Sequence, residues 1–140
     1  MKLERLFEVK NTKLFDLSGN EIAVSASMAK KIKWSEVESE AESYNEDFLA
    51  KLRDELKTLE SEKKFVFIEP EFDKNAPAEQ FITAMNHTAR RIKDCVSVIG
   101  FAIPAEISEF KDNFIEELSK KHQQYCYFCK KEISNDIVLY

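Results

Sequence analysis

The carboxylate best placed for chemistry in this 140-residue chain is Glu106. It follows an apolar run of strand length, residues 97–103, and the proline Pro104 that ends the run. In open α/β sheets, ligands bind beyond the carboxyl ends of the parallel strands. The spacing therefore predicts that Glu106 lies at such an edge, just after a parallel strand.

Two further carboxylates, Glu69 and Glu71, follow a second apolar run at residues 65–68. If the two strands are neighbours, these groups end close to Glu106 and form a reduced carboxylate pair. Glycoside hydrolysis uses two carboxyls, about 5 Å apart in retaining enzymes and about 6.5–9.5 Å apart in inverting ones. The competing interpretation of Glu106 is an exposed carboxylate near the start of a helix, because carboxylates at clefts mark active sites only probabilistically.

A second group of chemically capable residues lies near the C-terminal end: His122, Cys126 and Cys129, in the spacing H-x3-C-x2-C, with Cys95 as a potential fourth ligand. Imidazole and thiolate at such spacing suit zinc, which predicts a zinc- or thiol-dependent interaction module as one alternative. If residues 125–128 form a regular strand, however, the two cysteines point to opposite faces. Buried structural thiols are the other interpretation.

Aromatic side chains could stack on sugar rings, and Trp34 and Tyr44 are the candidates for a surface groove. Most of the other aromatic residues are phenylalanines at helical or strand spacing, which is typical of a core. His87 falls off the apolar stripe of its expected helix and is interpreted as a surface histidine. The sequence predicts no cofactor.

The elements that would position these residues follow from the hydrophobic periodicity. Helices are expected at residues 45–62, with Asn45 as N-cap, at 78–94, and after Ser108 as the cap of a third helix. The expected strands are the buried runs 65–68 and 96–103 and the candidates 125–128 and 137–140. Residues 5–26 read as strands of a hairpin with a turn at 16–20, and 26–33 are ambiguous.

Helices that alternate with continuous apolar strands predict an α/β fold with a mostly parallel sheet and flanking helices. We expect one domain over residues 1–140. It divides into an N-terminal β-hairpin region, 1–30, and a βαβα region that is like a partial barrel, 31–140.

Three segments also carry a family resemblance. Residues 97–107 read S-V-I-G-F-A-I-P-A-E-I, residues 65–71 read F-V-F-I-E-P-E, and residues 34–45 hold Trp34, Glu38 and Tyr44 at a W-x3-E-x5-Y spacing. In this order they resemble the TIM-barrel glycoside hydrolases, especially the cellulases and mannanases of family 5. The resemblance covers roughly residues 14–120.

The resemblance implies a (β/α) barrel with Glu106 in the place of the acid/base glutamate. Ala105 stands where the family has asparagine, Glu71 stands at its histidine, and the nucleophile on a late strand has no counterpart. A complete barrel needs roughly 250 residues. We therefore expect a truncated, degenerate glycosidase-like protein without hydrolase activity, with a carbohydrate-binding or self-association role. An active glycoside hydrolase that uses Glu106 as acid/base is the enzyme alternative.

The composition of the chain restricts the classes of partner that we expect. The net charge of −5 disfavours nucleic acid and anionic membranes. The N-terminal segment lacks an apolar export signal, which predicts a cytoplasmic protein, although a mature chain with its signal removed would look the same. A carbohydrate is the expected ligand. An incomplete parallel sheet leaves an unpaired edge, which predicts a symmetric homodimer.

Overall fold

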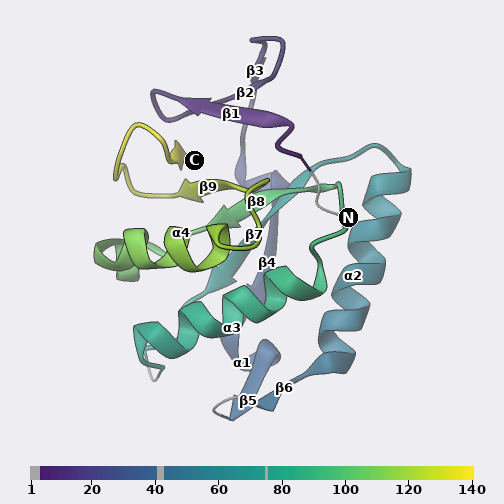
Figure 1. The fold of residues 1–140 in the computed structure, drawn as a ribbon, viewed down its shortest axis with the longest axis vertical. Coiled ribbons are helices and arrows are strands. Elements are labelled where there is room, and N and C mark those ends of the chain that lie inside the picture. The colour runs from purple at the N-terminus through teal and green to yellow at the C-terminus, as the bar shows by residue number, and fades with distance from the viewer. Residues whose placement is uncertain (1–3, 41–42, 75) are drawn as a thin grey trace.

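A parallel sheet of five strands is the centre of the fold. The computed structural model describes residues 4–40, 43–74 and 76–140. In these residues the strand order of the sheet is β10-β9-β8-β7-β4 (Figure 1). Each strand of the sheet therefore lies beside the one that precedes or follows it in the sequence of these five strands. Its strands are β4 (Ala29–Lys33), β7 (Val66–Glu71), β8 (Val98–Ala102), β9 (Cys126–Cys129) and β10 (Val138–Leu139). The expected α/β class with a parallel sheet is confirmed, and within the described ranges β4 and β10 do not pair to close it.

Three helices connect these strands and cover one face of the sheet. They are α2 (Glu46–Ser61), α3 (Ala78–Arg91) and α4 (Lys111–Ser119). The N-cap Asn45 accepts a hydrogen bond from the backbone N–H of Phe48, as expected for α2. The apolar stripes of the helices pack on sheet residues such as Ile68 and Phe101 in the larger core cluster. The three helical crossovers therefore leave the sheet on the same side.

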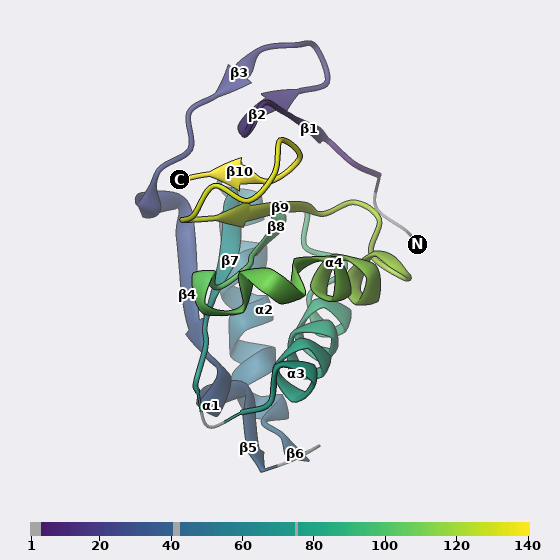
Figure 2. The same ribbon diagram turned by 90° about the vertical axis from the view of Figure 1, so that its left-hand side faces the viewer.

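A small antiparallel sheet covers the other face. It consists of β1 (Phe7–Lys10), β2 (Lys13–Asp16) and β3 (Glu21–Ile22), and Figure 2 shows it on the side of β9 opposite α3 and α4. Phe7 and Leu14 pack there on Phe67 and Phe128. The expected N-terminal hairpin is confirmed, and its turn is held by the Asp16 carboxylate, which accepts hydrogen bonds from two backbone N–H groups.

Strand β8 contains a β-bulge at Ile99 and Gly100. Val66 of β7 pairs with Val98, but Ile68 pairs with Phe101, so β8 carries one extra residue. As a result Val98 and Phe101 both face the helices, three positions apart, where a regular strand would alternate. The bulge decides which face the carboxyl half of β8 presents.

The structure differs from the sequence prediction at the start of the third helix, and it resolves the ambiguous segment 26–33. Ser108 does not cap the third helix, because residues Ala105–Phe110 form the 3-10 helix η2 and α4 begins only at Lys111. The ambiguous residues 26–33 form a short 3-10 helix, η1 (Ala26–Met28), and then β4. The chain between β4 and α2 forms three short elements: α1 (Trp34–Val37), β5 (Glu38–Glu40) and β6 (Ser43–Tyr44). Among the described helices, none has the length and apolar character needed to cross a bilayer.

Candidate functional site at the carboxyl edge of the sheet

A cavity of about 340 Å³ lies at the carboxyl ends of the parallel strands. We call it the carboxyl-edge pocket. Its charged and hydroxyl-bearing lining comes from strands β4 and β7 and from the residues that follow β8, β9 and β10: Lys31, Glu69, Glu71, Glu106, Lys130 and Tyr140. The position agrees with the rule that parallel sheets bind ligands beyond their carboxyl ends. Its volume lies at the lower end of the usual range for small-molecule sites, about 300–1,000 Å³.

Glu106 lies in the first turn of η2, four residues after the last residue of β8. The expected strand before it is thus confirmed, and β8 is parallel to both of its neighbours. Because β7 is one of those neighbours, Glu69 and Glu71 reach the same pocket as Glu106. The three carboxylates singled out in the sequence are therefore brought together.

The carboxylates differ in their surroundings. The Glu69 side chain is only 15% exposed, and its Oε2 accepts a hydrogen bond from the hydroxyl of Tyr140 and lies 3.7 Å from Lys130 Nζ. Burial, and then the neighbouring Glu69, raise the pKa of Tyr140 far above its usual range, so its hydroxyl remains a donor. Glu71 and Glu106 are both exposed to solvent.

The pairing of β4 with β7 places opposite charges side by side along one face of the sheet. Lys31 is in register with Glu69, and Lys33 with Glu71. Of these two lysines, Lys31 lines the pocket. Adjacent opposite charges on one face of a sheet stabilise the pairing modestly. They also give the pocket both hydrogen-bond donors and acceptors.

Trp34 and Tyr44 have partners elsewhere. The indole N–H of Trp34 donates to Glu38 Oε1 at 2.8 Å, and Gln80 donates to the same oxygen at 2.9 Å. Glu38 is 1% exposed, so both bonds satisfy a buried carboxylate. Tyr44 stacks on His87, with 4.1 Å between ring centroids. These contacts position the segment between β4 and α2 and do not bring either ring into the pocket lining.

The cysteines of β9 lie on opposite faces of the sheet. Cys126 belongs to the cluster under the hairpin, where its thiol donates to the Phe7 carbonyl at 3.7 Å, and Cys129 belongs to the cluster under the helices. Burial raises the pKa of both thiols. His122 is buried beside Tyr125, and burial lowers its pKa. Within the described ranges, no three His, Cys, Asp or Glu side chains are arranged to hold a metal ion.

Three polar residues of the pocket are not predicted from the sequence as site residues: Lys31, Lys130 and Tyr140. Lys31 belongs to the ambiguous segment before Trp34, and Lys130 follows a strand whose neighbours the sequence does not reveal. Tyr140 carries one signal, because it ends the apolar run 137–140, which is a candidate strand in the sequence. No family model, curated protein or solved structure matches this chain significantly.

Proposed function

We propose that this protein binds a small polyhydroxylated ligand of the carbohydrate class at the carboxyl-edge pocket, without turning it over. The observation that carries the proposal is the convergence of Glu69, Glu71 and Glu106 on one cavity with lysine and tyrosine donors. Sugar hydroxyls both donate and accept hydrogen bonds, so a lining with carboxylates and ammonium groups suits them. Phe72 and Pro104 add apolar surface to the same lining, against which the C–H groups of a sugar can pack.

The architecture supports the same proposal. A partial (β/α) barrel would have sequential strand order with its helices on one face, and barrel enzymes place their sites at the carboxyl ends of the strands. The carboxyl-edge pocket lies at the corresponding edge of this sheet. Fold alone does not define an activity, so the proposal depends on the side chains of the pocket.

The absence of turnover is proposed from the residues that differ from the glycosidase pattern. Ala105 precedes Glu106 in place of an asparagine, and Glu71 stands in place of a histidine. Glu69, the third candidate carboxylate, is held by Tyr140 and Lys130. Without an opposing nucleophile, the oxocarbenium-like transition state loses its main stabilising charge.

The binding proposal is tested by calorimetry and by NMR titration with mono- and disaccharides. We expect Glu71→Gln and Glu106→Gln each to weaken binding about tenfold, which corresponds to about 1.4 kcal/mol. The matched control is Glu109→Gln, because Glu109 is an exposed glutamate of the same 3-10 helix as Glu106 and does not belong to the pocket lining. Equal affinity in all three variants would contradict the proposal, as would no binding of any sugar to the parent chain.

The second candidate is an active glycoside hydrolase with Glu106 as acid/base. The observation that favours it is the shared pocket of Glu106 and Glu71, which supplies two exposed carboxylates. The test is the release of the aryl group from aryl β-glycosides. Our proposal predicts no turnover above that of Glu106→Gln. Turnover that disappears in this variant would establish the hydrolase instead.

A further inference from the structure

The charges of the carboxyl-edge pocket are unevenly matched. Two lysines line it, Lys31 and Lys130, and of the two it is Lys130 that forms an ion pair with Glu69. Lys130 Nζ lies 3.7 Å from Glu69 Oε2, and Lys31 is in register with Glu69 on the neighbouring strand. With the Tyr140 hydroxyl also donating to it, Glu69 is the satisfied carboxylate of the pocket.

Glu71 and Glu106 have no such counterions. In the part of the chain that the structure describes, no lysine or arginine nitrogen lies within 4 Å of a carboxylate oxygen of either residue. Lys33 is the lysine in register with Glu71, but its side chain does not line the pocket. Two exposed carboxylates, one at the end of β7 and one in η2 after β8, therefore line one cavity without an ion pair of their own.

Such a cavity selects ligands by charge. Two like charges that share a site are stabilised when a cation enters between them, and an anionic ligand would add to the repulsion. Hydrogen bonds between an ammonium group and a carboxylate are shorter and about twice as strong as neutral ones. A protonated amine is thus the ligand group that Glu71 and Glu106 would bind best.

We infer that the ligand of this pocket is a hydroxylated amine of the amino-sugar class, whose ammonium group is bound between Glu71 and Glu106. Its hydroxyls then lie toward the donors of Lys31 and Lys130. This inference rests on the proposed carbohydrate-binding function and specifies its substrate class. A neutral sugar binds more weakly, and a sugar acid binds most weakly of the three.

The experiment compares glucosamine, glucose, N-acetylglucosamine and glucuronate by calorimetry at about pH 6, where an amine is protonated. We expect glucosamine to bind about tenfold more tightly than glucose or N-acetylglucosamine. N-acetylglucosamine is the ligand control, since acetylation removes the charge and retains the ring. Raising salt should reduce the preference, because screening weakens exposed charge pairs.

Variants of the two glutamates distinguish this inference from the proposed carbohydrate-binding function on which it rests. Glu71→Gln combined with Glu106→Gln should abolish the preference for glucosamine, and Glu109→Gln should keep it. Equal affinity for glucosamine and glucose, or a preference that survives in the double variant, would overturn the inference while leaving carbohydrate binding intact. No binding of any of the four sugars would overturn the proposed function itself.

Discussion

Gly100 allows β8 and β9 to approach each other at the bulge. A Cβ atom added to Gly100 would lie 1.6 Å from the backbone oxygen of Cys126 and 2.6 Å from its carbonyl carbon. Both are backbone atoms of the neighbouring strand, so the collision cannot be relieved by a side-chain rotation. The absence of a side chain is thus a requirement of strand pairing at this position.

We expect Gly100→Ala to lower the free energy of unfolding by about 3 kcal/mol or more, because β8 must separate from β9 or lose the bulge. Chemical denaturation measures the loss. Gly19→Ala is the matched control: Gly19 has φ of +90° and open space around it. It should cost about 1–2 kcal/mol, from backbone strain alone. Equal losses in the two variants would contradict this account of the bulge.

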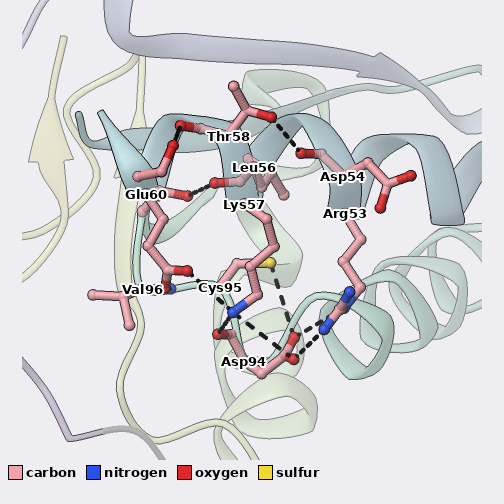
Figure 3. A network of polar contacts seen from close by, with 11 residues as sticks. Arg53, Asp54, Leu56, Lys57, Thr58, Glu60, Asp94, Cys95 and Val96 are labelled. Carbon is pink, nitrogen blue, oxygen red and sulfur yellow. Dashed lines mark hydrogen bonds and ion pairs between the residues drawn. The ribbon is translucent and has the colours of Figure 1, made fainter. Parts of the chain in front are cut away.

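At the scale of the elements, α2 is fastened to the turn between α3 and β8 by a polar network (Figure 3). Arg53 donates to the Asp94 carboxylate, with the shorter bond 2.5 Å long, and Lys57 donates to the Asp94 backbone oxygen at 2.7 Å. The Glu60 carboxylate accepts the backbone N–H of Val96 at 2.8 Å. The turn directly precedes β8, so the network holds the start of the strand that leads to Glu106.

This network makes stability depend on pH. The backbone N–H of Val96, and then Lys57, lower the pKa of Glu60, and Arg53 lowers the pKa of Asp94. A carboxyl whose pKa is lower in the folded state contributes stability above its unfolded pKa, about 4, and loses it as the pH falls through the folded value. We expect the unfolding free energy to fall as the pH drops below about 5, and to fall less steeply in Glu60→Gln.

Denaturation curves across this pH range check that expectation. Glu62→Gln is the matched control, because it removes one negative charge from the same end of α2 without touching the network. A Glu60→Gln protein with the parent's pH dependence would exclude Glu60 as a contributor.

At the scale of the whole molecule, the two outer strands of the parallel sheet, β10 and β4, differ in how their edges are protected from further pairing. The β10 edge is covered by the turn between β1 and β2, because backbone groups of Thr12 bond to Asn135 and Leu139 at 3.0 and 3.1 Å. At the opposite edge, β4 carries the lysines Lys30, Lys31 and Lys33. Lysines on an edge strand oppose pairing with a second sheet. A dimer through the open edge would have to form at β4.

We propose that this symmetric dimer forms, and that it strengthens with salt. Twofold pairing of β4 strands brings the lysines of two copies together, and salt screens their repulsion. Light scattering at micromolar concentration should therefore show a larger dimer fraction at high salt. A mass of 16.3 kDa, that of one chain, at every salt concentration would reject the dimer.

The sequence by itself determined the main helices and strands of this protein and the position of Glu106. The cap Asn45 and the spacing of Leu49, Leu52 and Leu56 predict α2, and the apolar run that ends at Pro104 predicts both β8 and the position of Glu106. These signals depend on hydrogen bonds and periodicities within a few residues, which a sequence displays directly. The parallel sheet follows from their alternation.

Only the tertiary structure decided what surrounds Glu106. Lys31 reaches the pocket because β4 pairs with β7 in one particular register, and Tyr140 reaches Glu69 across 71 positions of the chain. The bulge at Gly100 turns the last residues of β8 to faces that regular alternation would not give them. Register and bulges are set by packing between distant segments, so the carboxylates could be named from the sequence, but their partners could not.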